Sequence, residues 1–160
     1  MHRALAEAGL GRPEDALWDW HVALNFDPSL ASEDLGRFGD PGSLLAANPL
    51  REPRPTPLAD GEAVSVHASP PGKLTPPRVR QTTRPKFPFG TQFFGVRGRV
   101  VVETIITKDG QVIQPRVLEG LDKPTLVCSA LEALRKWVIR PARLNGVPVA
   151  VYYALTVHFE

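Results

Sequence analysis

The sequence predicts an α+β fold, in which one helix packs on a small antiparallel sheet in the order β-β-α-β. Three observations predict it: two β-branched runs joined by an Asp-Gly turn, an amphipathic helix after them, and a long apolar run that ends the chain. A short α-helical segment and a proline-rich linker come first. The predicted regions are a helical segment at 1–40, a linker at 41–90 and the folded domain at 91–160.

The first 40 residues predict two short helices, at about Arg3 to Leu10 and about Pro13 to Phe26. Apolar residues recur along one face of the second helix, and a proline at its start suits the first helical turn. This segment resembles a partial tetratricopeptide repeat at five positions: Gly11, Ala16, Trp20, Ala23 and Pro28. A single repeat cannot bury its own apolar face. We therefore expect it to dock on the C-terminal domain, or the natural chain to begin earlier.

Proline and charge both mark residues 41–90 as a linker. Eleven of the 17 prolines lie between Pro41 and Pro88, and residues 70–95 carry five basic residues and no acid. Proline biases the chain toward extended conformations, so a semi-rigid spacer is expected, with one short strand at 62–68. The basic stretch has no pattern of stacking aromatics, which favours a solvated linker over a nucleic-acid-binding arm.

The domain begins with a predicted hairpin around Lys108-Asp109-Gly110. Pro115 in its second strand cannot donate a ladder hydrogen bond, so that strand lies at a sheet edge or contains a bulge. Asp122 is the expected N-cap of the following helix, whose core-facing stripe is Val127, Ala130, Leu131, Leu134 and Val138. Trp137 is expected in the core, and a turn at Asn145-Gly146 leads into the terminal strand.

The segment from about residue 85 to 160 resembles the C-terminal domain of the TonB family of energy transducers. The likeness rests on "RPKFP" at 84–88, "GRVVVETIITKDGQV" at 98–112, "ALEALRKWVIRPARLNGVPVAV" at 130–151 and "YALTVHF" at 153–159. It implies a periplasmic interaction module that couples an inner-membrane motor to outer-membrane transporters by pairing an edge strand with a transporter segment. The chain departs from the family in its short linker, in lacking an N-terminal membrane helix, and in having Val127 where an acidic residue is frequent.

The terminal strand is the predicted binding site. From Val149 to Val157 it carries no charged residue, and an edge without such protection is either an aggregation hazard or a docking site. A partner segment would bind there by β-augmentation, taking up free main-chain groups. The predicted partner-binding residues are Arg143, Val149, Val151, Tyr152, Tyr153, Leu155 and Val157.

The expected partner is a protein, either an outer-membrane transporter segment or a subunit of a larger complex, and the same edge could instead form a homodimer. Two functions stay open. One is a periplasmic module that binds a partner by strand addition, in energy-coupled outer-membrane transport. The other is a scaffold or accessory subunit that uses helical repeats and a TonB-like domain for assembly.

No catalytic, cofactor or metal site is predicted, and we expect no enzyme. The four histidines, His2, His21, His67 and His158, have no spacing typical of a metal site, and no glycine-rich phosphate loop occurs. Cys128 lies among small and apolar residues, where a buried, inert thiol is expected. No run of about 18 apolar residues occurs, so no segment is expected to span a membrane, and no secretory signal is expected.

Overall fold

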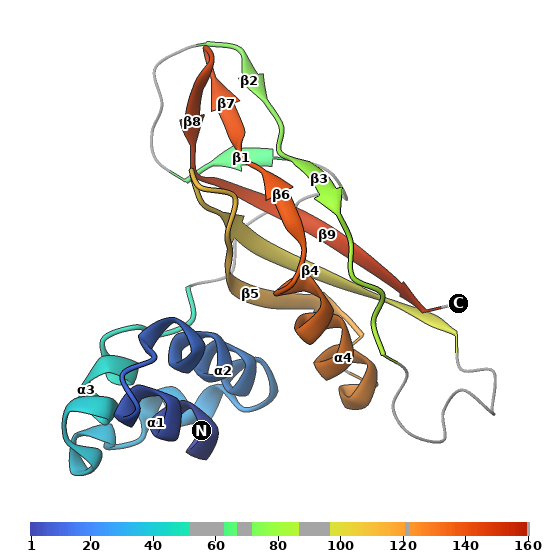
Figure 1. Ribbon diagram of the computed structural model, residues 1–160. Coiled ribbons are helices and arrows are strands. Elements are labelled where there is room, and N and C mark those ends of the chain that lie inside the picture. Colours follow the sequence, from blue (N-terminus) through green and yellow to red (C-terminus); the bar gives the residue numbers. More distant parts are fainter. Residues whose placement is uncertain (52–62, 67–71, 87–96, 121, 160) are drawn as a thin grey trace. The chain divides into compact units, whose positions relative to one another are not determined.

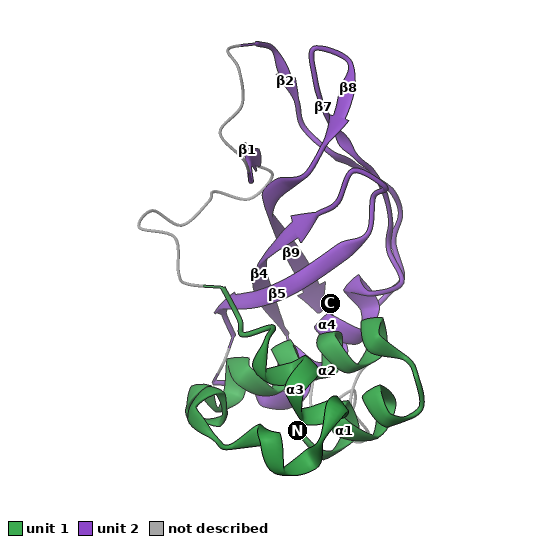
Figure 2. Cartoon of the chain, turned by 90° about the vertical axis from the view of Figure 1, so that its left-hand side faces the viewer, with its two compact units in different colours: residues 1–53 green, residues 54–160 purple. Residues whose placement is uncertain are grey.

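The computed structural model describes residues 1–51, 63–66, 72–86, 97–120 and 122–159 (Figure 1). They belong to two compact units, Met1–Pro53 and Arg54–Glu160, which are coloured separately in Figure 2. The boundaries predicted at residues 40 and 90 stay predictions. Among the described residues, no helix has both the length and the apolar character that a membrane span needs.

The first unit consists of short helices that build their own core. Helices α1 (His2–Gly9) and α2 (Pro13–Phe26) are followed by the 3-10 helices η1 (Pro28–Ser32) and η2 (Leu35–Phe38) and by α3 (Asp40–Ala46). The core contains Ala4, Ala16, Trp20, Leu24, Leu35 and Leu45. Leu35 and Leu45 lie outside the predicted helix pair, in η2 and α3. The segment that follows the helix pair therefore covers the apolar face that a single repeat would leave exposed. The likeness to a tetratricopeptide repeat stays a prediction.

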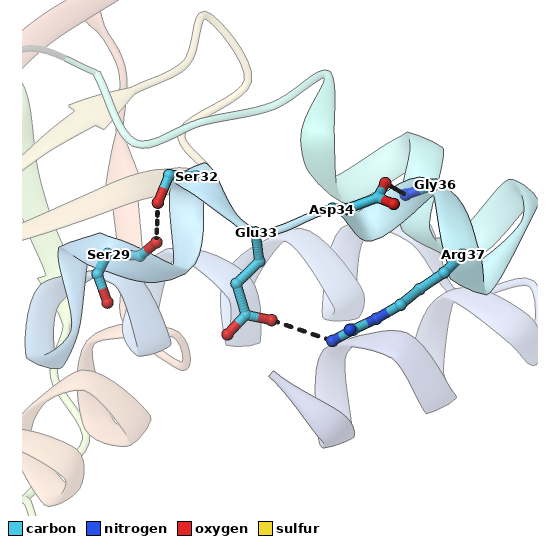
Figure 3. Close-up of polar contacts among 6 residues, drawn as sticks. All are labelled: Ser29, Ser32, Glu33, Asp34, Gly36 and Arg37. Carbon is cyan, nitrogen blue, oxygen red and sulfur yellow. Dashed lines mark hydrogen bonds and ion pairs between the residues drawn. The ribbon is translucent and has the colours of Figure 1, made fainter.

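Short polar contacts shape the turns between η1 and α3 (Figure 3). The Ser32 hydroxyl donates to the Ser29 carbonyl at 2.7 Å, and the Asp34 carboxylate accepts the Gly36 amide at 3.1 Å. Arg37 and Glu33 form an exposed ion pair at 3.3 Å. Exposed pairs contribute little to stability, whereas a capping carboxylate satisfies an amide that the helix leaves unpaired. The cap at Asp34 is therefore the contact that positions η2 and, with it, Leu35.

His21 is a buried titratable group in α2, with 4% of its surface exposed. Its Nε2 lies 3.1 Å from the carbonyl oxygen of Asn48. Burial lowers the pKa of His21 from its usual value of 6.5; the hydrogen bond to Asn48 opposes this shift, and the charge of Arg51 adds to it. The folded first unit therefore favours the neutral imidazole.

The second unit is built on a four-stranded antiparallel sheet in the order β1-β9-β4-β5. These strands are β1 (Ala63–Ser65), β4 (Gly98–Ile106), β5 (Val112–Glu119) and β9 (Val151–Phe159). Helix α4 (Pro124–Leu134) contacts β4 and β5 (Figure 1), and it buries the stripe Leu126, Val127, Ala130, Leu131 and Leu134. The fold is α+β, with a helix packed on an antiparallel sheet.

Strand β5 shows the features that its proline predicts. It forms one edge of the sheet, and its register with β4 shifts between Glu103 and Ile105. Gln114, just before Pro115, has a φ of 48°. The Thr104 hydroxyl donates to the Ile113 carbonyl at 2.9 Å, across the irregular part of the pair. The edge position and the irregular register are both confirmed.

Part of the predicted linker pairs with the domain. β2 (Leu74–Thr75) lies beside β7 (Ala142–Leu144), which also pairs with β8 (Val147–Val149), and β3 (Arg78–Gln81) pairs with β6 (Val138–Arg140). The expected short strand is present as β1; residues 62, 67 and 68 lie outside the described residues. Proline-rich sequence therefore does not prevent pairing here, because the prolines of this stretch lie between the short strands and not within them.

Four residues differ from expectation. Val138, predicted as part of the core-facing helical stripe, lies beyond the end of α4 in β6 and is 51% exposed. Cys128 is exposed, because the apolar stripe of α4 turns its neighbours Leu126 and Val127 toward the sheet instead. Partial burial and the nearby Glu132 raise the pKa of its thiol, so the thiolate is disfavoured. Trp137 lies beyond the end of α4, is half-buried, and donates its indole N–H to the Thr83 carbonyl at 3.1 Å. The N-cap of α4 is Lys123 and not Asp122.

We expect the first unit to lose stability as the pH falls. Because the folded-state pKa of His21 lies below 6.5, the unfolded chain binds a proton more readily, and stability declines on going from pH 7.5 to 5.5. Chemical unfolding followed by the fluorescence of Trp18 and Trp20, in a Trp137→Phe background, measures this unit alone. His21→Gln should flatten the pH dependence and the control His2→Gln should not. An unchanged dependence in His21→Gln would contradict the assignment.

Candidate strand-pairing site on the terminal strand

The terminal apolar run does not form one long free edge, as the sequence suggested. Asn145 and Gly146, with φ of 51° and 87°, turn β7 back on β8, and β9 begins only after Ala150. β4 then covers the whole of β9 on one side, from Gly98 opposite Phe159 to Ile106 opposite Val151. Since β4 is as long as β9, no residue of β9 extends beyond this partner.

Among the described residues, strand pairing on the other side of β9 is confined to its start. Strand β1 pairs there, with Ser65 opposite Val151 and Ala63 opposite Tyr153. No other described strand pairs with this side, so among the described residues the stretch Ala154–His158 has β4 as its one strand partner. The candidate site is therefore the part of this edge that lies beyond β1, together with the part that β1 occupies.

The direction of the main-chain groups decides which residues can pair at this edge. The amide of Val66 donates to the carbonyl of Ala150 at 3.2 Å, so Ala150 directs its main chain toward β1. In an antiparallel ladder this direction alternates from residue to residue. The residues of β9 that face the same edge are therefore Tyr152, Ala154, Thr156 and His158. The neighbouring Val151, Tyr153, Leu155 and Val157 direct their main chains toward β4.

Side-chain burial separates the predicted site residues into two groups. Val151, Leu155 and Val157 are 0%, 4% and 2% exposed. They share a face with Gly98 and Val100, and a Cβ added at Gly98 would lie 3.7 Å from Leu126 of α4. These three residues are core, and they support the edge without offering side chains to a partner.

The remaining site residues lie around the strand start or off it. Tyr152 and Tyr153 are half-buried where β1 pairs. Val149 is half-buried in β8, and exposed Arg143 in β7 donates to the Gly146 carbonyl at 2.8 Å. Thr156 and His158, whose main chains face the open edge, were not predicted from the sequence. They can be identified only from the alternation of main-chain direction along β9, which the pairing of Ala150 fixes.

The arrangement suits main-chain recognition. The stretch Ala154–His158 carries no Lys, Arg, Asp or Glu, and its main-chain donors and acceptors are spaced along the edge where a partner strand could pair. In the described part of the chain, no three His, Cys, Asp or Glu residues are grouped so that they could hold a metal ion.

Comparison with known proteins identifies the C-terminal segment. Residues 83–160 match the family described as Gram-negative bacterial TonB protein C-terminal. This segment resembles a TonB C-terminal domain. Protein TonB of Vibrio cholerae serotype O1 is 31% identical over 85 residues, which are 53% of this chain and 35% of that protein. The chain thus spans about a third of the length of this TonB relative.

A solved TonB structure also resembles the chain. The solution NMR structure of the Pseudomonas aeruginosa TonB CTD has 28% sequence identity, covers 52% of this chain and 85% of that one, and gives a TM-score of 0.44. The family match begins at residue 83, so β1, β2 and β3 lie before the matched TonB domain. The strand that occupies the start of β9 is therefore contributed by the preceding segment of this chain.

Main-chain direction predicts opposite effects of proline at adjacent positions of β9. Thr156→Pro removes an amide that points to the open edge, and we expect the domain to keep its fold. Val157→Pro removes an amide that bonds β4 and leaves a buried acceptor without its donor, which we expect to cost about 1–3 kcal/mol. Thermal unfolding followed by circular dichroism compares the two variants. Equal destabilisation would show that the assigned directions are wrong.

Proposed function

We propose that the TonB domain binds an extended segment of an envelope protein by strand addition along the β1 side of β9. The natural partner is an outer-membrane transporter, to which the family's proteins pass energy from the inner membrane. The observation that carries this proposal is the uncharged edge from Ala154 to His158, which has no second strand partner among the described residues. The family match supports a location in the cell envelope and a binding rather than a catalytic role.

Hydrogen-bond energetics indicate how much of β9 a partner would use. The outward residues Ala154, Thr156 and His158 present about six main-chain groups, and a net hydrogen bond contributes about 0.5–1.5 kcal/mol. Ordering an extended peptide offsets much of that gain, since each fixed backbone residue costs about 1–2 kcal/mol. A short open edge therefore binds weakly. Extending the pairing to Tyr152 requires the partner to displace β1.

Side chains beside the edge would supply specificity. Tyr152, Thr156 and His158 lie on the sheet face opposite the core residues Val151, Leu155 and Val157. An aromatic ring, a hydroxyl and an imidazole along one face fit alternate side chains of an extended segment. The partner-binding role predicted for Tyr152 and Tyr153 thus requires competition with β1, and Arg143 and Val149 would act only at the end of the site.

Peptide titration tests strand addition directly. We expect a labelled peptide from the periplasmic N-terminal segment of a transporter encoded in the same genome to bind, and Thr156→Pro to weaken it about two- to tenfold, since one ladder bond is lost. Thr156→Ala keeps the amide and loses only the hydroxyl, so it should weaken binding less than Thr156→Pro does. A folded Thr156→Pro variant with unchanged affinity would overturn the proposal. Mass measurements identify the alternative, a homodimer that Thr156→Pro converts to monomer without any peptide binding.

Loosening β1 should strengthen binding. Val64 lies opposite Tyr152 and directs its amide toward β9, so Val64→Pro removes one bond of a three-residue strand. If the partner displaces β1, losing about 1 kcal/mol of competition raises the affinity roughly fivefold. Ala63→Pro, whose amide points away from β9, is the matched control and should change the affinity little. Equal affinities in both variants would restrict the partner to Ala154–His158.

A further inference from the structure

The linker strands and the strands after α4 form one interrupted antiparallel ladder. Leu74 and Thr75 lie opposite Leu144 and Arg143, and the same register continues with Arg78 opposite Arg140. Between these pairs, Pro76 and Pro77 stand in register with Ala142 and Pro141. Three of these four residues lack an amide hydrogen, so the ladder cannot continue through them. The pairing opens at this point and closes again on either side.

A groove lies at the interruption. Its volume is about 240 Å³, and it is lined by Thr75, Pro76, Arg78, Arg140, Pro141 and Arg143. Half of the lining comes from the linker and half from the chain after α4. All three arginines are exposed, and no acidic side chain is among the lining residues. Two distant segments thus bring three positive charges to one concave surface with rigid walls.

The arginines of this groove are placed differently from those of the main sheet. Arg99 forms a two-pronged contact with Glu119, at 2.9 and 3.3 Å, and Arg116 lies opposite Glu103. In the groove, by contrast, Arg78 lies directly opposite Arg140. Like charges at such positions, with Cβ atoms about 5 Å apart, destabilise a strand pair. An anion held between them would remove this repulsion.

The guanidinium groups are available to a ligand. Arg78 and Arg140 make no ion pair or hydrogen bond within the described residues. Arg143 gives one N–H to the Gly146 carbonyl, which orients its side chain across the turn and leaves its other donors unused. A guanidinium has five donors in a fixed fork that matches the oxygens of phosphate or carboxylate.

We propose that this groove binds the phosphate group of a phosphate monoester, carried by a soluble ester or by a lipid headgroup. The groove is smaller than the roughly 300–1,000 Å³ of most ligand pockets, so it fits a compact group. A phosphate monoester brings a charge of about −2 and three acceptor oxygens to three arginines, whereas one carboxylate brings a single charge. The site lies on β2, β3, β6 and β7; it contains no residue of β9 and shares only Arg143 with the end of the proposed strand-addition site.

Phosphate binding by the full chain tests the proposal. We expect NMR titration with inorganic phosphate to shift the resonances of the lining residues, and Arg140→Gln and Arg78→Gln each to weaken binding about tenfold, the loss of one charged hydrogen-bonding group. Arg80→Gln removes the same charge from β3 outside the groove lining and should change the affinity less than about threefold. Melting temperatures of Arg140→Gln and Arg78→Gln should equal or slightly exceed that of the parent, because each variant removes the repulsion between these two exposed arginines.

Vesicles distinguish the two sources of the phosphate. Sedimentation with phosphatidic acid, a monoester, but not with phosphatidylglycerol, a diester, would assign a lipid headgroup. Phosphate binding without vesicle binding would assign a soluble ester. The proposal is overturned if phosphate does not bind, if Arg80→Gln weakens binding as much as Arg140→Gln, or if an oligoglutamate peptide displaces phosphate and binds more tightly.

Discussion

The pairing of β4 with β9 is the constraint on which the second unit depends. It joins nine residues to nine, end to end, and it brings together two strands of the segment that matches the TonB C-terminal family. Val100, Val102 and Ile106 of β4 are almost fully buried, as are Val151 and Val157 of β9. Because side chains alternate between faces, this register also decides which atoms of β9 are left for binding. A shift by one residue would exchange the core side chains for the exposed ones.

Local features of this domain could be predicted from the sequence. The Asp-Gly and Asn-Gly turns, the apolar stripe of α4 and the irregularity at Pro115 all arise from neighbouring residues, and the structure contains each of them. The partners of the short strands could not be predicted in this way. β1, β2 and β3 have two to four residues each, too few to show a period, and their pairing joins residues more than 50 positions apart.

The position of the candidate site could be predicted from the sequence, but the residues that form it could not. Its position on the terminal strand follows from an uncharged run, which composition reveals. The choice of residues within that run depends on which neighbour takes which main-chain groups. Leu155 and Val157 belong to the core although they look like contact residues, and Thr156 and His158 face the edge although nothing in their type suggests it. The hydrogen bond from the Val66 amide to the Ala150 carbonyl determines which residues of β9 direct their main chains toward this edge.

Proline has two opposed effects in the segment before the TonB domain. It fixes extended backbone geometry, which favours pairing with a neighbouring strand, and it removes the amide that pairing needs. Residues 74–81 resolve the conflict by pairing on both sides of Pro76-Pro77 and opening at the prolines themselves. The same property that predicted a linker therefore produces two short ladders with a basic groove between them. The segment that precedes the matched domain also pairs through β1 with the start of β9, so this stretch of chain contributes to both of the surfaces proposed for binding.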